Sequence, residues 1–167
     1  PSEFFAEHPE YYSERDGKRT TERAQLCLTN PDVLRIMTER VLARIRQDPQ
    51  AKLFSVSQND WGGWCRCPNC REIDEREGSP SGTMIHFVNQ VAEAVEAEFP
   101  DVWIETLAYQ YTRQAPRKVR PRSNVVVRLC SIRLTSPKYC PGPSSVTATG
   151  VPSAPSTSTW VCPLEII

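Results

Sequence analysis

The sequence has no excess of charge of either sign and no long hydrophobic run. Its 20 lysines and arginines balance its 20 aspartates and glutamates, so no net field draws it to nucleic acid or to an anionic membrane surface. No apolar stretch approaches the roughly 18 residues that a membrane-spanning helix needs. We therefore expect no nucleic-acid partner and no membrane span, while the oligomeric state stays open.

Phosphate-binding fingerprints and a second cysteine pair are also missing. Gly62-Gly63 lacks the spacing of a phosphate-binding loop, and the single group Cys65-x-Cys67-x-x-Cys70 lacks the partner pair of a zinc ribbon. The seven cysteines are an odd number, which fits neither a regular disulfide framework nor an ordinary cytosolic enzyme. The chain has 167 residues and no initial Met, and we expect a piece of a longer protein.

The composition changes abruptly after Arg133. Residues 134–167 contain six Pro, six Ser and five Thr, but only two charged residues, Lys138 and Glu165. We expect a folded domain over residues 1–133 and an irregular, disordered or out-of-frame tail over residues 134–167. Composition alone leaves open whether that tail is a flexible linker or the product of a lost reading frame.

Strand and helix patterns alternate along the first 133 residues. Asn30 followed by Pro31 predicts a helix start, with an end near Asp48. A second helix is expected between Ser81, as its cap, and Pro100. Strands are expected at residues 25–28, 52–57, 102–109 and 124–131, and a loop at 60–80. This order predicts an α/β fold of parallel βαβ units, whose function lies beyond the carboxyl ends of the strands.

The strand at residues 52–57 leads into polar and aromatic residues. Gln58, Asn59 and Asp60 offer amides and a carboxyl group, and Trp61 and Trp64 offer flat indole rings. Indole faces suit the C–H surfaces of sugars, and the polar groups suit hydroxyl and acetamido groups. The alternative is that Asn59 and Asp60 only begin a turn.

Four further residues are candidates for the same site. Tyr109 and Tyr111 follow the next strand and could hydrogen-bond a sugar, or could simply pack at the strand end. Glu105 is a reserve carboxylate, unless it pairs with an arginine such as Arg113 or Arg128. His8 is a candidate ligand contact, although a lone histidine is more often structural.

The Cys65, Cys67 and Cys70 group has three open interpretations: a structural zinc ion, a disulfide or plain thiols. Zinc would need a fourth ligand, for which Cys27 and His86 are the candidates. The basic segment at residues 117–122 has no interleaved aromatic residues and is expected to be a solvated loop.

Several ordered motifs resemble one family. They are Gln25-Leu26-Cys27-Leu28-Thr29-Asn30-Pro31, Ser55-Val56-Ser57-Gln58-Asn59-Asp60-Trp61-Gly62-Gly63, the three-cysteine group, Gly78-Ser79-Pro80-Ser81-Gly82-Thr83, Leu107-Ala108-Tyr109-Gln110-Tyr111 and Val127-Arg128-Leu129-Cys130-Ser131-Ile132. Together they resemble the domain of unknown function 4838 over about residues 4–132. That domain resembles the catalytic barrel of glycoside hydrolase family 163, whose members are endo-β-N-acetylglucosaminidases acting on complex N-glycans.

The resemblance implies a partial (β/α)8 TIM-type barrel and a glycan substrate. In related hexosaminidase barrels an Asp-Glu pair ends the fourth strand and serves a substrate-assisted mechanism. By analogy Asn59 would orient the 2-acetamido group and Asp60 would be the general acid/base, with Trp61, Gln58, Tyr109, Tyr111, His8 and Trp64 as substrate contacts. No cofactor is required. The family implies a secreted, periplasmic or cell-surface bacterial protein, and the break at Arg133 favours a lost reading frame.

Two other classes of function stay open. The chain could be a non-catalytic carbohydrate-binding module, in which Trp61, Trp64 and Tyr109 bind sugar, or an interaction domain stabilised by zinc at the cysteine group. If the chain holds only about half a barrel, we expect it to be inactive and poorly soluble alone.

Overall fold

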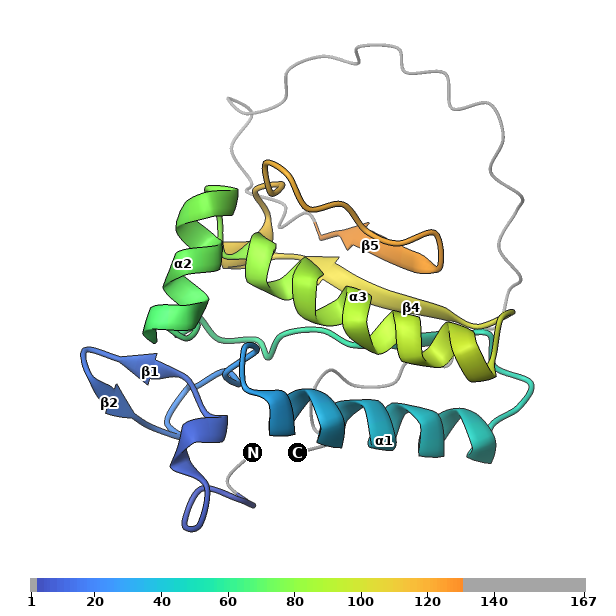
Figure 1. Cartoon of the computed structure of the whole chain (residues 1–167), viewed down its shortest axis with the longest axis horizontal. Helices are drawn as coiled ribbons and strands as arrows, with labels where there is room; N and C mark the ends of the chain where they lie inside the picture. The colour runs from blue at the N-terminus through green and yellow to red at the C-terminus, as the bar shows by residue number, and fades with distance from the viewer. Residues whose placement is uncertain (1–2, 131–167) are drawn as a thin grey trace, which may run out of the picture.

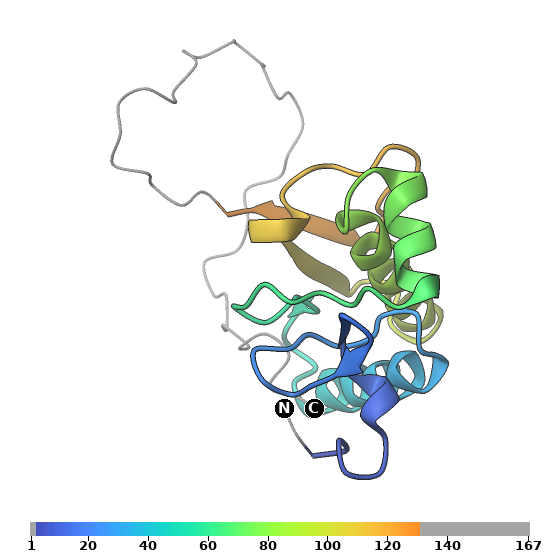
Figure 2. The same ribbon diagram turned by 90° about the vertical axis from the view of Figure 1, so that its left-hand side faces the viewer.

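The computed structural model describes residues 3–130, and the expected tail at residues 134–167 lies outside this range. The described residues form a small parallel sheet with helices against one face, and an N-terminal hairpin beside them (Figures 1 and 2). In order, the elements are η1 (Pro9–Tyr11), β1 (Glu14–Arg15), β2 (Lys18–Arg19), α1 (Pro31–Gln47), β3 (Leu53–Ser55), α2 (Pro68–Glu77), α3 (Ser81–Glu98), β4 (Trp103–Ala108), η2 (Gln110–Thr112) and β5 (Val125–Leu129).

The expected parallel sheet is confirmed. Its strands lie in the order β3-β4-β5, with Phe54 beside Ile104 and Ile104 beside Val125. Within residues 3–130 the sheet is open and no closed barrel forms. Because all three strands run the same way, their carboxyl ends meet at one edge, as the sequence predicted.

Helix α1 begins and ends where the sequence predicted. The Asn30 side chain accepts hydrogen bonds from the backbone N–H groups of Asp32 and Val33, at 2.9 and 3.2 Å, and Pro31 is the first helical residue. The helix ends at Gln47, with Asp48 as its C-cap. The cap satisfies two backbone donors that the first helical turn would otherwise leave unpaired.

Helix α3 begins at the expected place, but Ser81 is not its cap. Ser81 is the first helical residue, and its hydroxyl lies within hydrogen-bonding distance of Ser79 Oγ and of the carbonyl of Gln114. Ser79 Oγ instead accepts the backbone N–H of Ser81 at 3.2 Å. The prediction was wrong because two serines compete for this helix start, and tertiary contacts decide which one faces the backbone donor.

The expected loop at residues 60–80 contains a third helix, α2. Pro68 opens α2 directly after Cys67, and Gly78 ends it with a φ of +74°. The expected strand at residues 25–28 is reduced to one bridge between Leu26 and Tyr12. Both differences concern short elements, in which local contacts outweigh hydrophobic periodicity.

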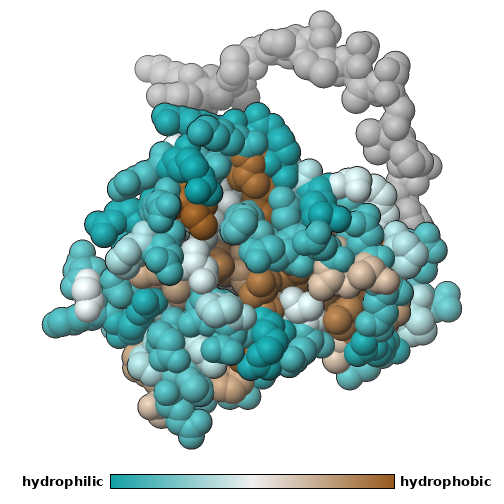
Figure 3. Space-filling view, in the orientation of Figure 1, coloured by the Kyte–Doolittle hydropathy of each residue, from teal (hydrophilic) through white to brown (hydrophobic). Residues whose placement is uncertain are grey.

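The core lies between the helices and one face of the sheet. Val88, Val91 and Val95 of α3 and Ile104 of β4 have no exposed side-chain surface, and α1 packs beside α3. In the space-filling view, apolar surface shows mainly in the hollows between polar ridges (Figure 3). Burial of each such side chain contributes about 1.5–3 kcal/mol, so α3 is the element that holds the sheet in place.

The sheet also carries exposed apolar side chains. Leu53, Trp103 and Val126 are 38%, 46% and 36% exposed. Next to them on the sheet, the buried carboxylate of Glu105 accepts a hydrogen bond from Arg128 at 2.7 Å.

No helix within residues 3–130 is long and apolar enough to cross a membrane, in agreement with the sequence.

Candidate functional site

The chain that leaves β3 turns sharply at the carboxyl edge of the sheet. Gln58 is buried, and its Nε2 donates to the carbonyl of Tyr109 at 2.9 Å and to the hydroxyl of Thr112 at 2.7 Å. These bonds join the exits of β3 and β4. The Oε1 of Gln58 has no partner among the described residues. Gln58 therefore fixes the geometry of the strand-end site and also holds an unused acceptor there.

Asn59 and Asp60 follow with different surroundings. The half-buried Asn59 donates from Nδ2 to the carbonyl of Ala24 at 3.3 Å. Asp60 is exposed, and its Oδ1 accepts from Nε2 of Gln110 at 3.0 Å. Asp60 comes from the exit of β3 and Gln110 from the exit of β4, so a carboxylate and two amides meet at the sheet edge.

Two residues that organise this edge were missed by the sequence analysis. Gln25 is 3% exposed and accepts the backbone N–H of Asn59 on its Oε1 at 2.9 Å. Its Nε2 donates to the carbonyls of Asn59 and Trp61. Gln110 has a φ of +49°, a conformation that costs a non-glycine residue about 1 kcal/mol or more. Neither role has a sequence signal, because both depend on contacts between distant segments.

The predicted aromatic residues divide into two groups. Trp61 is 49% exposed, and the guanidinium of Arg23 lies 5.4 Å from its ring centre. Trp64 stacks on Tyr111, with ring centres 5.1 Å apart and planes inclined by 18°. Burial, with the nearby Asp74 carboxylate, raises the pKa of Tyr111 well above its usual value. Trp61 is thus the open indole of the site, and Trp64 is packed.

The remaining candidates lie at different distances from the turn. Tyr109 is half-buried at the exit of β4, and its carbonyl bonds Gln58. Glu105 pairs with Arg128, one of the partners considered from the sequence. His8 stacks on Tyr11, with ring centres 4.6 Å apart, and its Nδ1 lies 3.0 Å from the carboxylate of Glu10. The structure thus brings Gln58, Asn59, Asp60 and Tyr109 together, and it places His8 in the N-terminal segment.

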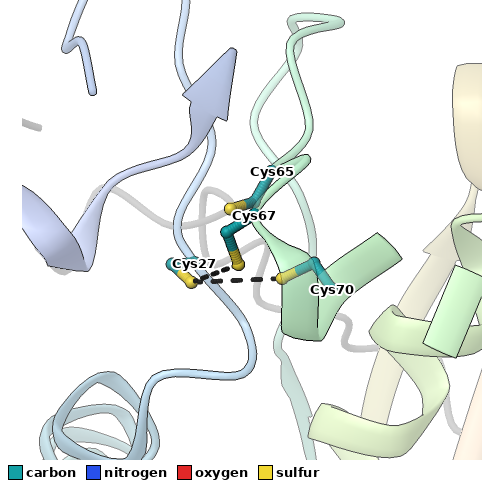
Figure 4. Close-up of side chains that lie close together, drawn as sticks. All are labelled: Cys27, Cys65, Cys67 and Cys70. Carbon is teal, nitrogen blue, oxygen red and sulfur yellow. Dashed lines mark hydrogen bonds between the residues drawn. The ribbon is translucent and has the colours of Figure 1, made fainter. Parts of the chain in front are cut away.

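The four cysteines Cys27, Cys65, Cys67 and Cys70, here called the cysteine cluster, form the second feature of the site. All four are buried, and their Sγ atoms lie within 4.8 Å of one another (Figure 4). Cys27 Sγ is 3.8 Å from Cys67 Sγ and 4.0 Å from Cys70 Sγ. A tetrahedral zinc ion with bonds of about 2.3 Å separates its sulfur ligands by roughly 3.8 Å. The cluster therefore has the size and the ligands to hold a metal ion.

The structure decides between the sequence interpretations of these cysteines in two respects. The cysteines of residues 3–130 are free thiols. The fourth member of the cluster is Cys27, whereas His86 is exposed on α3 and is not part of it. Cys27 precedes α1, Cys65 and Cys67 lead into α2, and Cys70 lies in its first turn, so the cluster joins segments about 40 residues apart.

Polar groups surround the cluster. The hydroxyl of Thr29 lies 3.2 Å from Cys70 Sγ. Cys65 Sγ accepts from the backbone N–H of Glu14 at 3.3 Å and from the guanidinium of Arg19 at 3.5 Å. N–H groups and a cation directed at sulfur are the outer contacts that stabilise metal-bound thiolates.

Hydrogen bonds between the thiols shift their pKa values in opposite directions. Hydrogen bonds from Cys65 and Cys70 lower the pKa of Cys27 strongly. The hydrogen bond with Cys27 raises the pKa of Cys65 to about 12 and raises that of Cys70 even more. A divalent cation that displaces the thiol protons would satisfy all four sulfurs.

Asp74 on α2 was not singled out in the sequence. It faces a small pocket lined by Trp64, Cys70, Thr83 and Tyr111 among others, and Thr83 donates to its Oδ1 at 2.5 Å. Burial raises the pKa of Asp74 to about 6. The pocket joins the Trp64–Tyr111 stack to the cysteine cluster, so the two features of the site are adjacent.

Comparison with known proteins identifies one family. The sequence model of a family described as a domain of unknown function, DUF4838, matches residues 1–140. No curated protein and no solved structure matches the chain.

Proposed function

The chain belongs to the DUF4838 family, and from that premise we propose that it is part of a glycoside hydrolase. The proposed substrates are N-glycan-type sugars with β-linked N-acetylglucosamine, cleaved with assistance from the substrate's own acetamido group. The site is the turn that follows β3, completed by the exit of β4.

The fold that we propose for the whole enzyme is a (β/α)8 barrel, of which residues 3–130 supply three strands. Two observations support it. The strands are parallel and neighbour one another in chain order, as consecutive barrel strands do. The sheet also carries the Glu105–Arg128 pair beside exposed apolar side chains, which suits a face that further strands enclose.

The proposed roles of Asn59 and Asp60 follow from their surroundings. Nδ2 of Asn59 is engaged by the Ala24 carbonyl, which leaves Oδ1 as the atom that would accept the acetamido N–H. The acetamido oxygen would then attack the anomeric carbon. Asp60 would protonate the leaving oxygen and later deprotonate the water. Trp61, exposed beside them, would receive the apolar face of a sugar ring.

The main support for this proposal is the hydrogen bond between the side chains of Asp60 and Gln110. Residues 50 positions apart place a solvent-accessible carboxylate and an amide in contact at 3.0 Å, at the carboxyl edge of a parallel sheet. Enzymes with such sheets bind substrates at that edge. A residue that merely began a turn would not need the contact with Gln110.

The test is the substitution Asp60→Asn at the matching position of a longer DUF4838 protein that has the same Gln-Asn-Asp-Trp segment. Release of glycan from a chitobiose-core substrate should fall by about 10²- to 10⁴-fold, the usual contribution of a general acid. Binding of the glycan should change little. Mass spectrometry of the released glycan measures the rate.

The matched control is Asp101→Asn. Asp101 is exposed and lies just before β4, at the opposite edge of the sheet. Its substitution should therefore leave hydrolysis unchanged. Undiminished hydrolysis after Asp60→Asn would refute the acid/base assignment. Glycan binding without hydrolysis in the unaltered protein would instead favour a carbohydrate-binding module built on Trp61.

A second proposal concerns the cysteine cluster, which we assign as a structural zinc site. Four buried sulfurs within 4.8 Å of one another, with Cys27 at 3.8 and 4.0 Å from two of the others, suit a closed Cys₄ site. Such sites stabilise a fold and take no part in the reaction. Here the ion would fasten the segment before α1 to the start of α2.

Metal analysis of the chain, purified under reducing conditions, tests the zinc site. We expect about one zinc ion per chain. A variant with Cys130, Cys140 and Cys162 all changed to Ser should keep the ion, whereas Cys67→Ser should lose it. Absence of stoichiometric metal from the unaltered chain would remove the zinc site and leave the glycan proposal standing.

A further inference from the structure

We infer that the metal centre is also the positioning device of the glycan site, and that Gln25 transmits its effect. This inference rests on the proposed functions of the cysteine cluster and of the Asn59–Trp61 turn. The ion would hold Cys27 and Cys65 in place. Cys27 would then position the turn through Gln25, and Cys65 would position it through the chain between Trp61 and Cys65.

Gln25 holds the turn through its side-chain amide. Its Oε1 accepts the N–H of Asn59, and its Nε2 donates to the carbonyls of Asn59 and Trp61. The residue is 3% exposed. A buried amide with both ends bonded to backbone groups sets the path of that backbone, because each lost bond would leave a buried polar group unpaired.

The turn from Asn59 to Trp61 is connected to the cysteine cluster at both ends. At its start the connection is made by the three hydrogen bonds of the Gln25 side chain, here called the clamp. Gln25 lies two residues before Cys27, so extended chain separates their Cα atoms by about 7 Å. At the other end, Cys65 follows Trp61 by four residues. The segment from Asn59 to Cys65 is therefore held at its start by Gln25 and at its end by a cluster member.

The connections run through the N-terminal segment, whose Tyr11, Tyr12 and Leu26 side chains pack against the helical core. The segment that carries Gln25 and Cys27 is tied to the N-terminal residues by bonds from Ser13 N–H to the Gln25 carbonyl and from Cys27 N–H to the Tyr11 carbonyl, at 2.9 and 2.8 Å. Cys65 likewise accepts from Glu14 and Arg19. Loss of the ion would loosen these polar contacts, while the packing of α3 on β4 does not depend on them.

Coupling between two sites is reciprocal, and this makes the inference measurable without a glycan. If metal binding stabilises the clamp, then breaking the clamp must weaken metal binding by the same factor. Gln25→Ala removes the side-chain bonds and leaves all four sulfurs in place. We expect it to lower the zinc affinity of the chain by about 5- to 10-fold, the lower part of the usual range for coupled sites.

The experiment combines competition with a chromophoric zinc chelator and hydrogen exchange of the whole chain. In Gln25→Ala, and in the unaltered chain stripped of metal, the amide of Asn59 should exchange faster, while amides at the centre of α3 stay protected. Gln47→Ala, an exposed glutamine at the end of α1, is the matched control and should change neither zinc affinity nor exchange at Asn59.

An unchanged zinc affinity in Gln25→Ala would overturn the inference, whether or not exchange at Asn59 accelerates. If stripping the metal unfolds the whole chain, the affinity of the metal-loaded Gln25→Ala variant still decides the matter. Failure of the underlying proposals looks different: no metal binding removes the zinc site, and coupling without any chitobiose binding removes the glycan function alone.

Discussion

At the scale of single residues, Asp74 shows how burial disfavours the charged form of a carboxyl group. Burial raises its pKa to about 6, against the hydrogen bond from Thr83. A carboxyl whose pKa is higher in the folded state binds more protons there. Its contribution to stability is therefore most favourable at low pH and is lost as the pH rises through about 6.

We therefore predict that Asp74→Asn stabilises the chain above neutral pH. The gain should be on the order of 1 kcal/mol, because solvent screens a half-buried group, and it should vanish near pH 4, where the aspartic acid is already neutral. Thermal unfolding at about pH 8 and pH 4 measures it. Equal destabilisation at both values would show that the carboxylate is needed for packing and that its burial carries no cost.

The residues of the candidate site could be predicted where they are adjacent in the sequence. Asn59, Asp60 and Trp61 are adjacent in the sequence and follow a strand, so their common position could be predicted. Gln25 and Gln110 could not, because a glutamine whose amide bonds a backbone group or a carboxylate 34 or more residues away looks like any other glutamine. For the cysteine cluster, the sequence grouped Cys65, Cys67 and Cys70 but left their role open, and the choice of Cys27 over His86 as the fourth member needed the fold.

At the scale of elements, Glu77 connects the end of α2 to the segment between β4 and β5. Its carboxylate accepts the backbone N–H groups of Lys118 and Val119, at 2.8 and 2.9 Å. These bonds lower its pKa, with the Val119 bond contributing most. Gly82 permits this contact, because a Cβ there would collide with the side chain of Glu77.

We predict that Glu77→Gln lowers the melting temperature at neutral pH. A carboxyl whose pKa is depressed by folding stabilises the protein above its unfolded pKa, and this stabilisation is lost as the pH falls through the folded value. The difference between variant and unaltered chain should therefore shrink in acid. Glu75→Gln, exposed on α2, is the control. A difference that persists unchanged below about pH 3 would indicate a packing effect.

The long helices were predictable and α2 was not, for physical reasons. Helix α1 has a capping Asn30, a Pro31 and a continuous apolar face, signals that agree with one another. Helix α2 is short and mostly polar, and its buried positions are Cys70 and Glu77. Its only local signals are Pro68 at the start and Gly78 at the end, and the cysteine cluster at its start is a tertiary feature.

At the scale of the whole molecule, the parallel order of the sheet was predictable from alternating strands and helices. What lies opposite the exposed Trp103 and Leu53 was not, because three strands in sequential order suit both a barrel and an open sheet. The cysteine cluster connects the most distant segments, since it joins the N-terminal hairpin, the segment before α1 and the start of α2.

We predict that removing the proposed zinc ion destabilises these connected segments. A ligand present at about 1,000 times its dissociation constant adds about 4 kcal/mol of stability. Treatment with a chelator should therefore lower the melting temperature by about 10 °C, and stoichiometric zinc should restore it. A melting temperature that does not respond to chelation of a metal-containing sample would contradict a structural role.

The most direct test of the central claim is to locate glycan binding on the chain itself. Backbone amide NMR signals of the zinc-loaded chain can be followed during titration with N,N′-diacetylchitobiose. We expect the shifts to concentrate at Asn59, Asp60, Trp61 and Gln110, at the carboxyl edge of the sheet. Saturating shifts elsewhere, or none at millimolar disaccharide, would contradict it.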